Sequence, residues 1–129
     1  MTTSGQDQAS AAVWTILHER LQERLRAFAQ ARDWDQFHSP KNLAMALIVE
    51  AAELVEHFQW LTAEQSAALP AQKKAAVADE LADVLVYVVR LADRLDVDLM
   101  QAVAEKLARN ETKYPAETVK GSAKKYTEY

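Results

Sequence analysis

The sequence predicts an all-α protein, an antiparallel four-helix bundle completed by homo-oligomerisation. Its 129 residues include only 2 Gly and 3 Pro, which leaves little turn chemistry for a sheet. Ala, Leu, Glu, Gln, Lys and Arg, which favour helix, are abundant. Apolar residues also recur close to the 3.6-residue helical period over long segments. Together these observations favour a bundle of long helices.

The first helix is expected over residues 10–32, after a small, polar stretch, 1–9, that predicts a disordered N-terminus. Its apolar positions share one face: Val13, Trp14, Leu17, Leu21, Leu25 and Phe28. Ser39 followed by Pro40 is typical of a helix start, with Ser as N-cap. The second helix is therefore expected over residues 40–60. It is apolar around most of its circumference, which indicates a helix that is either buried or faces both a core and an oligomer interface.

Thr62-x-x-Gln65 resembles a capping box for a short helix that ends before Pro70. A third helix is expected over residues 71–95, a break at 96–98, and a fourth helix over residues 98–112. No linker divides the chain. We therefore expect one domain over residues 10–114, followed by an irregular C-terminal tail, 115–129, that could wrap on a partner subunit.

Two short acidic motifs lie inside the apolar helices. Glu50-Ala-Ala-Glu53 falls in the second helix and Glu80-Leu-Ala-Asp83 in the third. At about 100° per residue, each pair shares one helical face. Carboxylates among core residues need compensation, and antiparallel packing would bring both pairs to one cation. Hard oxygen ligands favour Mg²⁺, Mn²⁺ or Ca²⁺, although spacing alone leaves open two solvated acidic faces.

Several other side chains could meet a ligand. Trp34, His38 and Trp60 could offer stacking surfaces for a nucleobase, or could simply plug the ends of the bundle. Tyr87 continues the stripe of Glu80 and Asp83. In the fourth helix, Lys106 and Asn110 are spaced i, i+4 and could contact a phosphate and a sugar or base. A solvated helix face is the simpler interpretation of this pair.

Composition excludes several function classes. There is no Cys, which rules out disulfides, zinc–thiolate sites and cysteine nucleophiles and fits a cytoplasmic location. A net charge of −4 argues against binding a nucleic acid polymer. No apolar run reaches the ~18 residues of a membrane span, and the polar start lacks the apolar segment of a signal peptide. Glycine-rich phosphate loops are also absent.

The chain resembles the MazG-like all-α nucleoside triphosphate pyrophosphohydrolases, and most of all their dCTP pyrophosphatase branch. The similarity lies in RDWDQFHSPKNLAMALIVEAAELVEHFQWLT, ADELADVLVYVVRLADRLDVDL, EKLARNETKYP and the terminal KYTE. It covers about residues 13–128. One departure is visible, because a first-helix His of relatives, nine residues before the Trp, falls here on Leu25.

The resemblance implies a homodimer or homotetramer that hydrolyses a (deoxy)nucleoside triphosphate, dCTP or a modified dCTP, to the monophosphate and pyrophosphate. That activity would remove unwanted nucleotides from the pool. The implied catalytic Mg²⁺ ligands, with Mn²⁺ as a possible substitute, are Glu50, Glu53, Glu80 and Asp83. The implied substrate-binding residues are Trp34, His38, Trp60, Tyr87, Lys106 and Asn110. Two alternatives remain at this point, a non-catalytic helical interaction module and a di-iron carboxylate bundle.

Overall fold

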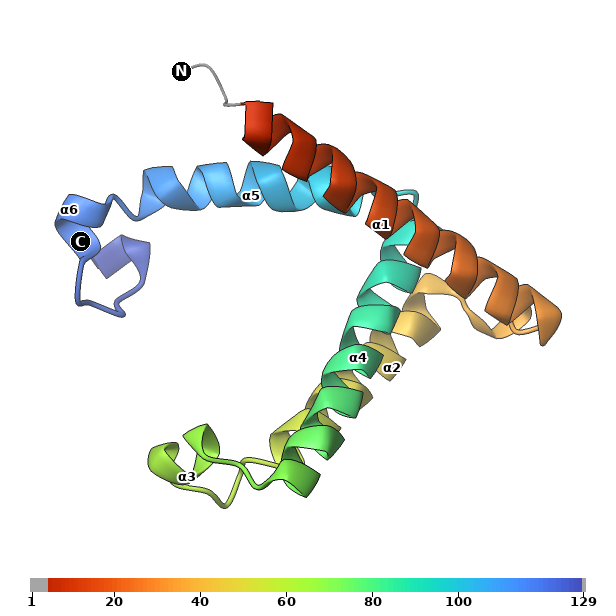
Figure 1. The fold of residues 1–129 in the computed structure, drawn as a ribbon, viewed down its shortest axis with the longest axis horizontal. Coiled ribbons are helices and arrows are strands. Elements are labelled where there is room, and N and C mark those ends of the chain that lie inside the picture. The colour runs from red at the N-terminus through yellow and green to blue at the C-terminus, as the bar shows by residue number, and fades with distance from the viewer. Residues whose placement is uncertain (1–4, 129) are drawn as a thin grey trace. The chain divides into compact units, whose positions relative to one another are not determined.

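The computed structural model describes residues 5–128, and these fall into two compact units that meet at the Val97–Asp98 boundary. The elements of the first unit are α1 (Gly5–Ala31), η1 (Asp35–Phe37), α2 (Pro40–Glu56), α3 (Ala63–Ala67) and α4 (Ala71–Arg94). Those of the second are α5 (Leu99–Lys113), α6 (Ala116–Val119) and η2 (Tyr126–Glu128). Figure 1 shows each element as a helix. The all-α class is confirmed, since no strand occurs among residues 5–128.

The disordered N-terminal segment expected from the sequence, residues 1–9, extends too far into the chain. α1 begins at Gly5, so the part of the expected disordered segment from Gly5 to Ala9 is helical, while residues 1–4 lie outside the described residues. The reason is local: the stretch after Gly5 holds no Pro and leads directly into alanines, and Asp7 places a carboxylate in the first turn.

α2 starts as the sequence predicts. The Ser39 hydroxyl accepts a hydrogen bond from the Asn42 backbone N–H at 3.2 Å, and Pro40 occupies the first helical position. Its end differs, because the helix stops at Glu56 rather than near residue 60. The amide of His57 bonds back to two carbonyls, and this tightens the chain into a turn.

α3 has the capping box that the sequence predicts. The Thr62 hydroxyl accepts from the Gln65 amide, and the Gln65 side chain accepts from the Thr62 amide. Asp98 caps α5 in the same manner, accepting from Gln101 at 3.0 Å. The tail is not wholly irregular, because a single helical turn, α6, and the 3₁₀ turn η2 lie within it.

Two aspartates end the long helices of the first unit. Asp33, after α1, and Asp96, after α4, have positive φ angles of 54° and 55°. The next residue in each case bonds back into the last turn, Trp34 to Ala29 at 2.9 Å and Val97 to Ala92 at 2.9 Å. Aspartate tolerates this left-handed conformation, which normally favours glycine. Asp33 thereby sets the direction in which the loop carrying Trp34 leaves α1.

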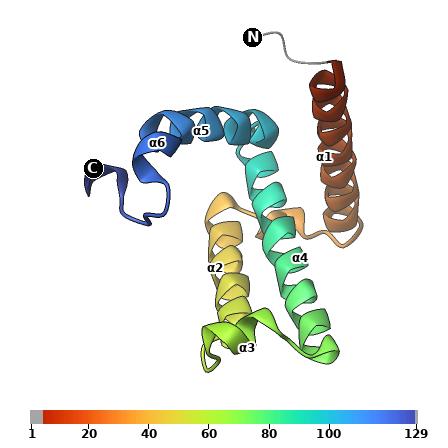
Figure 2. The ribbon, with the colours of Figure 1, turned by 60° about the vertical axis from the view of Figure 1, so that its left-hand side comes forward.

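Packing in the first unit is dominated by the antiparallel pair α2 and α4. They lie side by side in Figure 2, with the start of α2 beside the end of α4, and α1 contacts α4. Leu43 of α2 and Val89 of α4 are fully buried, and Ala29 brings the end of α1 into the same small core. The acidic motifs therefore face one another across an α2–α4 seam, as antiparallel packing predicts.

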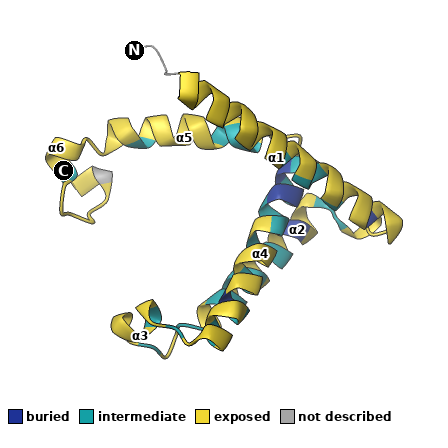
Figure 3. Ribbon diagram, in the orientation of Figure 1, coloured by how far each residue is buried: buried dark blue, intermediate teal, exposed yellow. Residues whose placement is uncertain are grey.

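Much of the apolar surface is not covered within the chain. Figure 3 shows exposed residues over most of α1. Trp14 of α1 is 65% exposed and Ile48 of α2 is 66% exposed. The fully buried positions are few, so the apolar stripes predicted to be core are only partly used as core by a single chain. No helix among residues 5–128 has both the length and the apolar character that crossing a bilayer requires.

Candidate active site

The two acidic motifs form one cluster. Glu50 of α2 and Glu80 and Asp83 of α4 each offer a carboxylate oxygen, and these oxygens lie within 4.8 Å of one another. Glu53 of α2 is near enough for its carboxyl to raise the pKa of both Glu50 and Glu80. The antiparallel seam therefore brings three of the four predicted carboxylates, Glu50, Glu80 and Asp83, into one cluster. Glu56, which drifts round the helix from this stripe, is exposed.

The cluster lacks the compensation that buried charge needs. Glu50 Oε2 and Glu80 Oε2 are both inaccessible to solvent and have no hydrogen-bond partner. Burial, together with the neighbouring carboxyls of Glu53 and Asp83, raises the pKa of Glu50 to about 7. Burial and Glu53 likewise raise the pKa of Glu80. Orphaned oxygens in an all-carboxylate donor set fit a hard divalent cation, which would favour the ionised forms.

A cavity of about 130 Å³ opens beside the carboxylates. Its walls come from α1, the loop after it, α2 and α4: Leu25, Phe28, Ala29, Trp34, His38, Glu50, Asp83, Val86, Tyr87 and Arg90. Two cluster carboxylates, Glu50 and Asp83, thus also line this largely apolar space. Its volume is below the roughly 300 Å³ of a pocket that encloses a drug-sized ligand. The cavity of one chain is therefore too small to enclose a ligand of that size.

Aromatic rings form one side of the cavity. Trp34 meets Phe28 edge to face with ring centroids 5.6 Å apart, and the His38 ring lies 6.3 Å from Trp34. Tyr87 lines the cavity next to the carboxylates. Burial and the charges of Glu50 and Asp83 raise the pKa of its phenol, so Tyr87 keeps its O–H as a donor.

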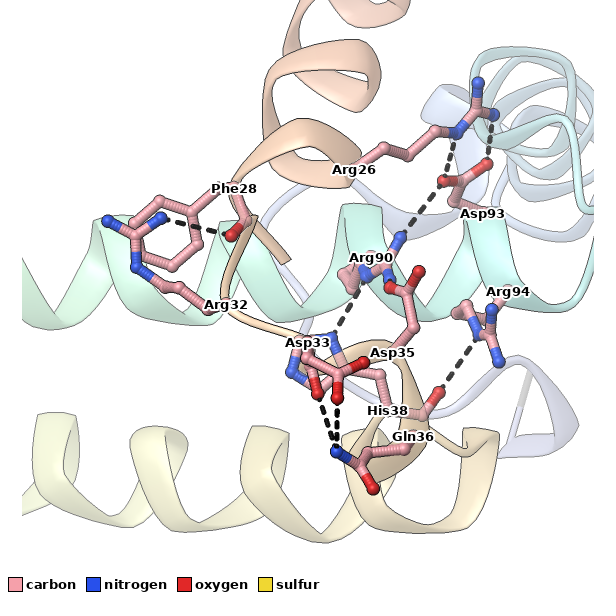
Figure 4. A network of polar contacts seen from close by, with 10 residues as sticks. All are labelled: Arg26, Phe28, Arg32, Asp33, Asp35, Gln36, His38, Arg90, Asp93 and Arg94. Carbon is pink, nitrogen blue, oxygen red and sulfur yellow. Dashed lines mark hydrogen bonds and ion pairs between the residues drawn. The ribbon is translucent and has the colours of Figure 1, made fainter. Parts of the chain in front are cut away.

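A network of ion pairs fastens the loop to α4 (Figure 4). Arg90, only 5% exposed, pairs with Asp35 at 2.5 Å and with Asp93 at 3.6 Å, and its Nε donates to His38 Nδ1 at 3.2 Å. Arg26 of α1 forms two hydrogen bonds with Asp93 and holds the pKa of that carboxyl below its usual range. Asp93 thereby joins α1 to α4.

The other three predicted substrate-binding residues are Trp60 of the first unit and Lys106 and Asn110 of the second. Trp60 sits in the turn after α2, is 87% exposed, and does not line this cavity. Lys106 and Asn110 belong to α5 in the second unit, where Lys106 lies beside Val103 and Leu107 in a shallow groove. The structure thus gathers Trp34, His38 and Tyr87 around the cavity, whereas Trp60 of the same unit does not line it.

Sequence reasoning missed two side chains near the cluster. Arg90 continues the stripe of Glu80, Asp83 and Tyr87 at helical spacing, so a lone Arg in an apolar run was the available signal. The other is His57, whose Nε2 lies 3.9 Å from Glu80 Oε1. It follows the helical part of α2, in a turn whose direction the sequence pattern did not predict.

Comparisons with known proteins show which family this chain resembles. A family model described as the MazG-like family matches residues 45–129. The chain is 43% identical to mouse dCTP pyrophosphatase 1, over 98% of this chain and 78% of the relative. It is 48% identical to the bovine protein of the same name, over 81% of this chain and 64% of the relative. A crystal structure of an Archaeoglobus fulgidus pyrophosphatase superposes with a TM-score of 0.72 at 40% identity, covering 75% of this chain and 91% of that one.

Proposed function

The chain belongs to the MazG-like family of nucleoside triphosphate pyrophosphohydrolases, and from that premise we propose that it hydrolyses dCTP or a modified dCTP to the monophosphate and pyrophosphate. The observation that carries the proposal is the carboxylate cluster, Glu50, Glu80 and Asp83, beside a cavity walled by aromatic rings. Phosphates would lie at the carboxylate end and the nucleoside in the cavity. The physiological role would be sanitation of the nucleotide pool in the cytoplasm.

The carboxylates would hold Mg²⁺, with Mn²⁺ as a possible substitute. The proposed ligands are Glu50, Glu53, Glu80 and Asp83, and the two orphaned oxygens on Glu50 and Glu80 support this assignment. When bound, such a cation neutralises phosphate charge and lowers the pKa of a coordinated water.

The residues of this chain supply positioning and proton transfer. Water attacks the α-phosphorus, the bond from that phosphorus to the bridging oxygen breaks, and pyrophosphate leaves. The carboxylate of Glu53 accepts the proton of the attacking water. Trp34 and Tyr87 hold the nucleoside, and the apolar side chain of Leu25 contacts it from α1. Exclusion of water from this apolar cavity strengthens every electrostatic contact within it.

The test of function is pyrophosphate release from each of the four dNTPs in the presence of Mg²⁺. The proposal expects dCTP to have the highest kcat/KM, with the monophosphate as the second product. Leu25→His restores the residue that relatives carry, and should change the ranking of nucleotides more than the rate. The matched control is Leu21→His, one turn earlier on α1. Absence of pyrophosphate release from every nucleotide would refute the enzyme assignment.

A further prediction concerns pH and the cation. In the metal-free protein the pKa of Glu50 is raised to about 7 from an ordinary value of 4.5, so the folded state binds more protons than the unfolded state between these values. Its contribution to stability is fully present below pH 4.5 and is lost as the pH rises through 7. Thermal melting should therefore show a falling Tm over this range.

Adding Mg²⁺ at pH 8 should raise the Tm again, by a stabilisation of about 2.7 kcal/mol when the cation is at about 100 times its Kd. Na⁺ at equal ionic strength is the control. An interaction module with solvated acidic faces predicts no specific response. A di-iron bundle predicts iron in protein purified from cells, which metal analysis would detect.

We also propose that the active protein is a homodimer or homotetramer. Exposed apolar side chains on α1 and α2 support this: Val13, Trp14, Ile16, Leu17, Met45, Ile48, Val49 and Val55. A second chain that covers them could also bring Trp60, Lys106 and Asn110 to a nucleotide that one cavity does not enclose. Residues 10–114 form the proposed catalytic domain, and the tail, 115–129, the segment that packs on the partner.

Light scattering of the protein as it elutes from a size-exclusion column should give a mass two or four times the 14.5 kDa of one chain. Replacing Ile48 by Glu, at a position 66% exposed in the single chain, should shift the mass toward one chain and lower activity with it. Lys41→Glu, at the exposed start of the same helix, is the control for added negative charge. A monomeric wild type with full activity would contradict the assembly.

A further inference from the structure

The ring of His38 is held from one side by a group that can only donate. Arg90 Nε donates to His38 Nδ1 at 3.2 Å, and a guanidinium has no lone pair with which to accept. Nδ1 must therefore be unprotonated. The proton of a neutral imidazole then resides on Nε2, the nitrogen that Arg90 leaves free. Figure 4 shows the ring between Arg90 and the loop that carries it.

Arg90 itself is not free to turn away. It is buried, and its guanidinium is shared among the ring of His38, the Asp35 carboxylate at 2.5 Å and the Asp93 carboxylate at 3.6 Å. Arg94, one turn further along α4, donates to the backbone carbonyl of His38 at 3.1 Å. Both the ring and the backbone of His38 are thus tied to α4. Burial and the charge of Arg90 also lower the pKa of His38, which keeps the ring neutral near pH 7.

We propose that Arg90 is a positioning residue that fixes His38 in its Nε2–H tautomer, so that His38 offers the cavity a donor and never an acceptor. His38 lines the cavity beside Trp34, and its Nε2–H meets an acceptor oxygen of the bound nucleoside. The oxygen is either the 2-carbonyl of the base or a hydroxyl of the sugar. The ligand part of this inference rests on the proposed function, whereas the tautomer does not.

The tautomer is measured in the full-length, ligand-free protein by long-range ¹H–¹⁵N correlation of the histidine side chains at pH 8. The chain has 3 His, and the signal absent from His38→Gln identifies the ring in question. The expected pattern is a protonated Nε2 and an unprotonated Nδ1. A protonated Nδ1, or a ring that averages both tautomers, overturns the proposal. This result does not depend on activity, so it separates failure of the tautomer from failure of the proposed function.

Steady-state kinetics with dCTP test whether the Nε2–H of His38 donates a hydrogen bond to the substrate. His38→Phe removes it and should raise KM about 3- to 10-fold with kcat little changed, the mark of lost uniform binding. His38→Gln places an amide donor near the position of Nε2 and should recover most of that loss. Equal KM values for His38→Phe and wild type, or no recovery in His38→Gln, overturn the ligand contact.

Two analogues distinguish the acceptor. If the base carbonyl is the partner, wild type discriminates against 2-thio-dCTP and His38→Phe loses that discrimination. If the sugar hydroxyl is the partner, wild type discriminates against 2′,3′-dideoxy-CTP and His38→Phe loses that discrimination. Retained discrimination in His38→Phe for both analogues overturns the contact with a nucleoside oxygen.

Arg90→Met tests the positioning role, with Arg94→Met as the matched control on the same helix. Arg90→Met should let the His38 ring populate both tautomers and should raise KM as His38→Phe does. Arg94→Met should leave the ¹⁵N signals of the His38 ring unchanged. A fixed Nε2–H tautomer in folded Arg90→Met overturns the role of Arg90. If circular dichroism shows that Arg90→Met is unfolded, the wild-type tautomer and the two His38 variants decide the proposal.

Discussion

Asp83→Asn should lower kcat/KM for dCTP by about 100-fold or more, while leaving the fold intact. Changes to groups that only support a metal ligand already cost 10- to 100-fold, and Asp83 is a proposed ligand. Its carboxylate lies within 4.8 Å of Glu50 and Glu80 oxygens, and the substitution removes charge but little volume. Removing one of several mutually repelling carboxylates should raise the Tm of the metal-free protein rather than lower it.

The measurement pairs initial rates of pyrophosphate release with thermal melting at several Mg²⁺ concentrations. Asp79→Asn is the matched control, because Asp79 lies one turn earlier on α4 and is exposed. Glu53→Gln should lose activity as Asp83→Asn does. Near-normal kcat/KM in either cluster variant would refute the ligand set, and an equal loss in Asp79→Asn would point to a general effect of charge.

Arg90→Met should destabilise the first unit by about 3 kcal/mol, because it leaves Asp35 without its partner and removes one of two from Asp93. Breaking a buried pair costs about 3–5 kcal/mol, and the lower figure applies since the Asp35 side chain is 38% exposed. The same change frees the loop that carries Trp34 and His38. For a domain of this size the loss corresponds to a fall in Tm of roughly 12–24 °C.

Denaturant unfolding and differential scanning calorimetry measure the change. Arg94→Met is the control, because Arg94 donates only one hydrogen bond, to the His38 carbonyl, and should cost about 1 kcal/mol. A double variant, Arg90→Met with Asp35→Asn, should recover part of the stability by removing the stranded charge. Equal stability of Arg90→Met and wild type would show that the network contributes nothing to the fold.

The sequence by itself determined the all-α class, the helix caps and the spacing of the acidic residues. Ser39 and Pro40 mark the start of α2, and Thr62 and Gln65 mark the start of α3, because caps depend on side chains within one turn. The spacing of Glu50 and Glu53, and of Glu80 and Asp83, is equally local. The sequence alone therefore shows that each acidic pair shares one face of its helix, and two such acidic faces predict a cation site.

What only the tertiary structure decided is which side chains meet across elements. Arg90 was passed over although it shares the stripe of Tyr87, because two of its partners, Asp35 and His38, lie on the loop before α2, more than 50 residues away in sequence. His57 faces Glu80 through a turn that the helical period does not describe. Trp60, close to Glu53 in sequence, does not line the cavity that Trp34 helps to form. Local interactions fix helices and caps, whereas the positions of loops and ion pairs follow from packing that no single segment contains.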